Sequence, residues 1–394
     1  MSDVIVDTVP EPVKTGWFTP FNFIAGIILA GGAIILGIRF TQGLAATTNL
    51  SNTYPWGLWI GFDVMSGVAL AAGGFVTSTA VYLFGMKEYK PVVRAALLTG
   101  FLGYFLVVLG LLADLGRPWR LPYPFIKSPG PTSPLFEVSL CVALYLTVLF
   151  IETTPAVFEW LGLKKFRKVV GGMTIALTIF GLILSTMHQS TLGAMFMVAP
   201  TRLHPLWYSG HIPVHFFVSA VAAGLAMVIV EGMVSHRAFH HQIQITQDHF
   251  RRINFGLAKA ASVALAIYFS IKVIALATED EWHLLGTGWG AYWLLEVLGF
   301  VLLPCLLFAV GYRERRLPVV RVAAVITVIG IMLNRFNVTF IAFNWNNPTA
   351  ETYIPSWMEI WVTVAFIIFA VVVFRWIANR MPIMYEHPDW KGVH

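Results

Sequence analysis

The chain has 394 residues, of which 57% are hydrophobic and only 12% are charged, whereas soluble globular domains carry about 25% charged residues. With a mean hydropathy of +0.74, these values exclude both a water-soluble fold and an intrinsically disordered chain. The net charge of +6 does not indicate nucleic-acid binding, because the basic residues are spread between apolar runs instead of forming one basic face.

Ten segments are apolar and long enough to cross a hydrocarbon core about 30 Å thick. They cover residues 18–43, 56–84, 91–113, 134–158, 168–187, 211–234, 253–277, 289–311, 318–341 and 356–379. The sequence therefore predicts an all-α, polytopic integral membrane protein with about ten transmembrane helices. We expect one membrane domain over 18–379, with short tails at 1–17 and 380–394.

Lysine and arginine residues alternate between the two sides of these ten spans. The loops on the side of the N-terminus carry 18 of them and the opposite loops carry five. Because cytoplasmic loops are enriched in Lys and Arg, we expect a multi-pass protein with both termini in the cytoplasm.

The loops expected on the outer side have an unusual composition. Residues 114–134 contain six prolines, residues 188–210 contain His, Trp and Tyr, and residues 342–356 contain Trp and several Asn. Proline stiffens an extended loop. We interpret this face as a docking surface for a partner; the alternative is an ordinary aromatic belt at the membrane interface.

Charged side chains inside membrane spans are costly and are candidates for function. With a rise of 1.5 Å per residue, most of the charged residues and histidines of the spans fall in the outer third: Arg39, Asp63, Asp114, Glu137, His188, His211, His215, Lys272, Glu296, Arg335 and Glu359. They either tie helices together or line a polar cavity that opens toward the outer leaflet and binds a small polar headgroup.

Asp63 is the strongest single candidate because it lies deepest, about 12 Å into the second span. The residues before it, 55–62, are rich in Trp and Gly. A buried carboxylate at this depth suits a proton acceptor, and Arg39 and Arg335 are the candidates to pair with it.

Haem and iron–sulfur ligands are not evident in the sequence. Cys141 and Cys305 both lie in apolar runs without a Cys-X-X-Cys motif, so we expect two buried thiols and no cluster. His188, His211 and His215 are the only histidines near a span, and all three fall at an edge. Because a b-type haem needs facing buried histidines, we expect no haem in this chain.

Several strings of residues together resemble the NrfD/polysulfide-reductase superfamily, especially its HybB-like branch. The resemblance covers roughly residues 20–380 and rests on Pro55-Trp56-Gly57, Phe62-Asp63, Asp114-Leu115-Gly116-Arg117, Leu121-Pro122-Tyr123, Leu135-Phe136-Glu137, Thr186-Met187-His188-Gln189-Ser190, His204-Pro205-Leu206-Trp207, Glu231-Gly232 and Ala342-Phe343-Asn344.

This resemblance implies helices arranged in NrfD-like bundles in the bacterial inner membrane and a role in respiratory electron transfer. Such subunits bind menaquinone near the outer face, and some are thought to conduct protons. Their implied partners are a periplasmic ferredoxin-like subunit with [4Fe–4S] clusters, either a nickel–iron hydrogenase or a multihaem cytochrome c, and other membrane subunits. The sequence alone leaves the choice between hydrogenase and cytochrome open.

The residues are therefore assigned the following expected roles. Asp63, His188 and Glu137 would carry protons to a quinone, while Arg39 or Arg335 would hydrogen-bond its carbonyl group. Trp56, Trp59 and Tyr123 would flank the ring, and the motif residues Asp114, Arg117 and Gln189 would complete the site. Two other functions stay open, namely a solute or ion transporter, which predicts discontinuous helices, and a purely structural membrane anchor.

Overall fold

The computed structural model describes residues 16, 18–243, 245–347, 352–385 and 390. Within this part of the chain the regular elements are helices, apart from one isolated bridge between Leu203 and Phe343. Ten helices, some of them composite, are long and apolar enough to cross a membrane. The predicted all-α polytopic fold with ten spans is confirmed.

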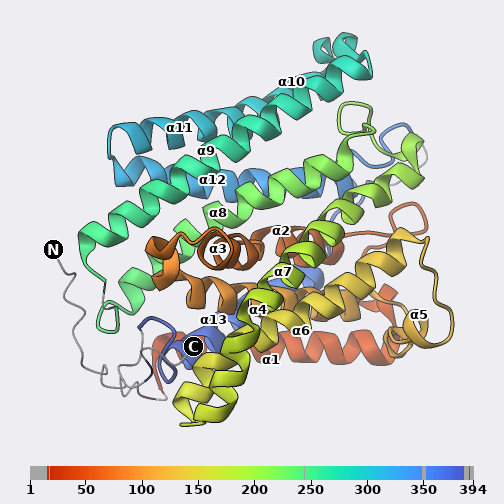
Figure 1. Cartoon of the computed structure of the whole chain (residues 1–394). Coiled ribbons are helices and arrows are strands. Elements are labelled where there is room, and N and C mark those ends of the chain that lie inside the picture. Colours follow the sequence, from red (N-terminus) through yellow and green to blue (C-terminus); the bar gives the residue numbers. More distant parts are fainter. Residues whose placement is uncertain (1–15, 17, 244, 348–351, 386–389, 391–394) are drawn as a thin grey trace.

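The spans are made of the following elements (Figure 1). They are α1 (Pro20–Gln42), η2 with α2 and α3 (Trp59–Ser66, Gly67–Leu70 and Gly73–Tyr82), α4 (Lys90–Asp114), α6 (Pro134–Trp160), α7 (Lys164–Ala194), α8 (Ile212–Ala238), α9 (Gln247–Thr278), α10 with η8 and α11 (Gly288–Leu294, Leu295–Leu302 and Leu303–Arg313), α12 with η9 (Leu317–Phe336 and Asn337–Ile341), and α13 (Trp357–Ala378).

The helices form two adjoining bundles. In the first, η2–α3, α4, α6 and α7 pack together, and in the second, α8, α9, α11 and α12 pack together. Helix α8 also contacts α7 and α3, which joins the bundles. The first and last spans, α1 and α13, pack against each other, and α13 lies against α4.

Local sequence signals explain several helix starts. Thr19 caps α1 by accepting a hydrogen bond from the amide of Asn22, and Pro20 occupies the first turn, where no amide donor is needed. At α13, Ser356 and Glu359 form a capping box. These caps determine where the first and the last span begin.

The second span is not the continuous helix expected over 56–84. It begins as a π-helix at η2 and is interrupted at Ala71 and Ala72 between α2 and α3. The interruption packs against Gly224 of α8, where an added Cβ would lie 2.6 Å from the amide nitrogen of Gly73. A side chain at Gly224 would therefore push the two bundles apart.

The loops meet at two opposite ends of the molecule. We call the end formed by residues 43–58, 115–133, 199–211, 279–287, 342–347 and 352–356 the aromatic end. There the amide of His204 donates to the carbonyl of Ala342 over 3.0 Å, and the amide of Gly210 donates to Glu279 over 3.1 Å. These contacts hold three separate loops together.

The opposite, basic end is fixed by a buried ion pair. Arg94 donates two hydrogen bonds of 2.7 Å to the carboxylate of Glu159 and a third to the carbonyl of Pro382. Arg167 also contacts Glu159, at 2.9 Å. The segment after α13 is thereby held against α4 and α6.

Among the spans that are longer than predicted, α7 and α9 differ most. Helix α7 covers Lys164–Ala194 instead of 168–187, and α9 covers Gln247–Thr278 instead of 253–277. The apolar run alone underestimates these helices, because polar residues continue the helical pattern beyond it. His188 consequently lies inside α7 and is fully buried, so its expected position at a helix edge was wrong.

Candidate functional site

Asp63 is buried in the π-helix η2, facing α4 and α13. Its Oδ2 accepts a hydrogen bond of 2.8 Å from the hydroxyl of Thr363 on α13. Gly110 of α4 lies directly against it, since an added Cβ there would be 2.7 Å from the Cβ of Asp63. Asp63 does not pair with Arg39 or Arg335, the two arginines considered from the sequence.

Arg39, near the end of α1, is also buried and reaches the end of α4. Its Nε donates to the carbonyl of Ala113 and its Nη2 to the carbonyl of Leu115. These carbonyls lie in the last turn of α4 and at its C-cap, where no intrahelical donor remains. The neighbouring Asp114 has a buried Oδ1 without a hydrogen-bond partner among the described residues. A guanidinium and an incompletely bonded carboxylate thus lie together at the aromatic end.

Glu359, at the start of α13, connects this region to the loops. Its carboxylate accepts hydrogen bonds from the amide of Ser356 (2.8 Å) and from the hydroxyl of Tyr353 (2.5 Å). Its backbone carbonyl accepts the indole N–H of Trp59 over 3.2 Å. We call Arg39, Trp59, Asp63, Asp114, Glu359 and Thr363 the Asp63 cluster.

His188 belongs to a second set of contacts deeper in the first bundle. Its Nδ1 lies 2.6 Å from the carbonyl of Leu184, so Nδ1 carries the proton and Nε2 accepts the hydroxyl of Tyr104. The ring of Tyr145 packs against both His188 and Tyr104. The adjacent Gln189 donates to the carbonyl of Val68 over 3.0 Å.

Helix α4 contacts both the Asp63 cluster and the residues around His188, because Gly110 lies against Asp63 and Tyr104 bonds His188. These α4 residues are six positions apart, about 9 Å along the helix axis. The two predicted proton carriers therefore contact the same helix at different depths and have different immediate partners.

The other residues of the first half are more peripheral. Glu137, at the start of α6, accepts a 2.9 Å hydrogen bond from Thr191 of α7. Trp56 packs against Phe196 and Phe343. Arg117 and Tyr123 are exposed in the proline-rich loop, and Tyr123 stacks with Lys127 instead of lining the cluster.

Arg335 is placed in the second bundle, in a separate polar network. It donates to Oδ1 of Asn334 (2.7 Å), to the hydroxyl of Ser219 (2.8 Å) and to the carbonyl of Phe216 (3.2 Å). Asn334 in turn donates to Glu296 over 2.8 Å. We call Lys272, Glu296, Asn334, Arg335 and Asn337 the Glu296 network.

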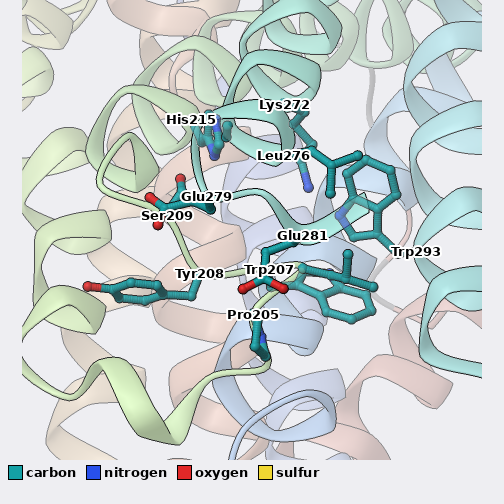
Figure 2. A pocket seen from close by; sticks show the side chains of 12 residues that line it. Pro205, Trp207, Tyr208, Ser209, His215, Lys272, Leu276, Glu279, Glu281 and Trp293 are labelled. Carbon is teal, nitrogen blue, oxygen red and sulfur yellow. The ribbon is translucent and has the colours of Figure 1, made fainter. Parts of the chain in front are cut away.

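Glu296 has a complete set of donors. Lys272 and Asn334 donate to one carboxylate oxygen, and Trp207 and Asn337 donate to the other, over distances of 2.6 to 2.9 Å. Beside Lys272 is a small pocket (Figure 2). It is lined by residues of α8, α9, α10, η7 (Glu281–Gly286) and the 205–209 loop.

Sequence reasoning missed two members of these sites. Tyr104 and Thr363 lie within apolar spans and are not charged, so the search for buried charge passed over them. Thr363 follows Glu359 by four residues, one helical turn, and this spacing was the available signal. Tyr104 has no comparable signal, because its role depends on a helix distant in sequence.

The described residues contain no group of three or more His, Cys, Asp or Glu side chains arranged to hold a metal ion. Both cysteines are buried and free, as expected. Because Nε2 of His188 is bonded to Tyr104, it is not free to ligate haem iron in this arrangement. The absence of haem stays a prediction.

Comparison with known proteins gives three informative relatives. A protein of Nitratidesulfovibrio vulgaris is 55% identical over 95% of this chain and 97% of its own length. The probable Ni/Fe-hydrogenase 2 b-type cytochrome subunit of Escherichia coli is 29% identical over 95% of both chains. The menaquinone reductase integral membrane subunit of N. vulgaris is 27% identical over 88% of this chain and 87% of its own.

The family match explains the resemblance found in the motifs. Residues 46–346 match the family described as polysulphide reductase, NrfD. This range includes η2, α4 and α6–α12, and therefore both helix bundles. The chain is a multi-pass integral membrane protein and belongs to the NrfD family of membrane subunits of quinone oxidoreductase complexes.

Proposed function

We propose that the chain exchanges electrons between a partner docked at the aromatic end and the menaquinone pool, with the quinone headgroup bound at the Asp63 cluster. The observation that carries this proposal is the incomplete hydrogen bonding of two carboxylates, the buried Asp63 and the half-buried Asp114. Asp63 accepts from one hydroxyl, and Asp114 has an oxygen without a partner. Buried polar groups of this kind are normally satisfied by a ligand or water.

The chemistry of quinone reduction fits these residues. Two electrons and two protons must reach the ring, and the chain offers no metal ligand set among its described residues, so the electrons come from the partner. Asp63 supplies a carboxylate that exchanges a proton with the ring oxygen. Arg39, beside Asp114, stabilises negative charge that develops on a carbonyl oxygen. His188, through Tyr104, and Glu137 are the next proton carriers in the proposal.

The orientation of the chain is part of the proposal. The loops of the basic end hold most of the Lys and Arg residues, which favours the cytoplasmic side. The aromatic end then faces the periplasm, where a ferredoxin-like subunit with [4Fe–4S] clusters docks. A nickel–iron hydrogenase or a multihaem cytochrome c would complete the electron path, and the named relatives support an oxidoreductase complex.

A photoreactive menaquinone analogue tests the location of the headgroup. Irradiation of the purified complex should attach the analogue to peptides of η2, the end of α4 and the start of α13, and excess menaquinone should prevent the labelling. Labelling confined to the second bundle would contradict the Asp63 site. If the complex assembles but shows neither quinone turnover nor labelling that excess menaquinone prevents, the chain is a structural anchor.

The interrupted second span favours one additional activity, proton conduction through the chain. Discontinuous helices at a membrane midplane are typical of ion pathways, and the turn at Ala71 and Ala72 is such an interruption. Proteoliposomes that contain the complex and a trapped pH dye should report a quinone-dependent pH change across the membrane. An unchanged internal pH during turnover would remove this second activity without affecting the first.

The absence of haem has its own test. A reduced-minus-oxidised spectrum of the subunit separated from its partners should lack the α-band of a b-type haem. A stoichiometric haem content in the isolated subunit would overturn this expectation and would require ligands other than the Tyr104-bonded His188.

A further inference from the structure

The pocket beside Lys272 contains polar atoms that need a partner. Nε1–H of Trp293 is a buried donor without a hydrogen-bond partner among the described residues, and Nε2 of His215, also without one, is an acceptor in the neutral ring. His215 is 8% exposed and Trp293 only 3%. Both residues line the pocket, together with Lys272. A buried N–H without a partner costs free energy, so the pocket is suited to a ligand that accepts hydrogen bonds.

The charges around the pocket indicate the sign of the group inside it. The buried network contains two cations, Lys272 and Arg335, but only one carboxylate, Glu296. Arg335 bonds only neutral groups, and it keeps its charge in proteins. The remaining titratable side chains that face the network include His215, Tyr268 and Tyr292, which carry no negative charge at neutral pH. One positive charge is therefore left without a buried counter-charge.

The donors that are still available converge on the same space. Figure 2 shows the ammonium of Lys272 and the indole nitrogen of Trp293 directed toward one region of the pocket. The Lys272 nitrogen lies 5.9 Å from the centre of the Trp293 ring. One of its three hydrogens is used by Glu296 at 2.9 Å. Oxyanions are the groups that accept several hydrogen bonds from such donors.

The mouth of the pocket has the opposite charge. Glu279 and Glu281 line it at the start of the α9–α10 loop. Two carboxylates at the entrance repel a simple anion but attract an ammonium group. A ligand that satisfies both ends carries an oxyanion and an ammonium a few bonds apart.

We propose that this pocket binds a small zwitterion, with its oxyanion at Lys272 and Trp293 and its ammonium at Glu279 and Glu281, and that the occupant is the headgroup of phosphatidylethanolamine. The position supports a lipid source. Lys272 lies six residues before the end of α9, about 9 Å along the axis, and α9, with 32 residues, is about 48 Å long and exceeds the hydrocarbon thickness. The pocket is thus near the level of lipid headgroups.

Native mass spectrometry of the full-length protein, with the subunits that co-purify, tests this site. After delipidation, phosphatidylethanolamine, phosphatidylglycerol and phosphatidylcholine are added separately. Phosphatidylethanolamine should bind most tightly, because only its ammonium offers N–H donors to the carboxylates. Lys272→Met should weaken its binding about tenfold, the value of one charge-assisted hydrogen bond. Lys259→Met, on the exposed face of the same helix, should not change it.

A second variant keeps the test decisive if Lys272→Met does not fold. Glu279→Gln combined with Glu281→Gln changes only the mouth and should shift the preference from phosphatidylethanolamine to phosphatidylglycerol. Free phosphoethanolamine should compete with the lipid; if it binds while the lipid does not, the lipid source is wrong. Equal binding of the three lipids by the wild-type protein, or unchanged selectivity in the Gln variant, would overturn the site. The readout is lipid binding, so its failure leaves the proposed electron transfer untouched.

Discussion

Asp63 in the first bundle and Glu296 in the second are both buried carboxylates, but their surroundings are opposite. Glu296 accepts four hydrogen bonds, one of them from the ammonium of Lys272, which fills its acceptor positions. Asp63 accepts one, from the neutral hydroxyl of Thr363. A fully bonded, paired carboxylate is held in its charged form and stabilises the fold. A sparsely bonded one is available to exchange a proton with a ligand.

Glu296→Ala should give the largest effect on stability. Removal of one partner of a buried ion pair typically costs about 3–5 kcal/mol, because Lys272 and the amides of Asn334 and Asn337 lose their acceptor. We expect little folded protein, measured as yield and thermal stability in detergent. Glu314→Gln is the control, since Glu314 pairs with Arg316 at the surface, where ion pairs contribute about 1 kcal/mol or less. Wild-type stability of Glu296→Ala would contradict the structural role of the network.

Arg39→Met should destabilise the protein less. It leaves the carbonyls of Ala113 and Leu115 without their donors at the end of α4, a loss of about 1–3 kcal/mol. The melting temperature should fall, and quinone affinity should fall with it if the guanidinium contacts the ring carbonyl. Arg39→Lys should restore part of the stability but not the paired geometry. Unchanged melting of Arg39→Met would show that these two bonds contribute nothing.

His188→Leu and Tyr104→Phe should have similar, intermediate effects on turnover. Both remove the hydrogen bond between Nε2 of His188 and the Tyr104 hydroxyl, and Phe keeps the packing against Tyr145. If this pair relays protons, quinone-linked electron transfer should fall about 10²-fold in each, the lower end of the usual range for an acid–base group. Normal turnover in Tyr104→Phe together with slow turnover in His188→Leu would assign the role to the imidazole alone.

The smallest expected effect concerns pH and the loops of the aromatic end. Burial among Trp207, Trp289 and Trp345 lowers the pKa of His204 to about 4, and its Nδ1 accepts the amide of Leu206 over 3.2 Å. The folded state therefore favours the neutral ring. Its stabilising contribution is complete above the unfolded pKa of about 6.5 and is lost as pH falls toward 4.

His204→Gln should remove this pH dependence. Thermal melting between pH 7.5 and pH 5 should show a smaller decrease in melting temperature for the variant than for the wild type. An equal decrease in both proteins would mean that other groups, and not His204, control acid sensitivity at this end.

The fold was largely predictable, because hydropathy and charge alternation report each span independently. Ten apolar runs and the alternation of Lys and Arg predicted ten spans, and the structure has ten. The interruption at Ala71 and Ala72 was not predicted, since small apolar residues are compatible with a helix, and the tight fit of Gly224 depends on another bundle.

The candidate site was only partly predictable. The search for charged residues at a common membrane depth identified Asp63, Arg39 and Arg335. Depth alone, however, does not show which helices are neighbours. Arg335 lies in the other bundle, and the partner of Asp63 is the uncharged Thr363. Side-chain partners depend on helix rotation and packing, which a single sequence does not report.

Asp63→Asn is the most direct test of the difference between the two carboxylates. Asparagine keeps the size of the side chain and the acceptor for Thr363 but does not exchange a proton. The measurement is quinone turnover per assembled complex, with the partner's own activity as the internal reference and Asp248→Asn, at an exposed position, as the matched control. We predict normal assembly and a turnover lower by about 10²-fold or more. Assembly with turnover at the wild-type rate would contradict the assignment of Asp63 as the proton acceptor.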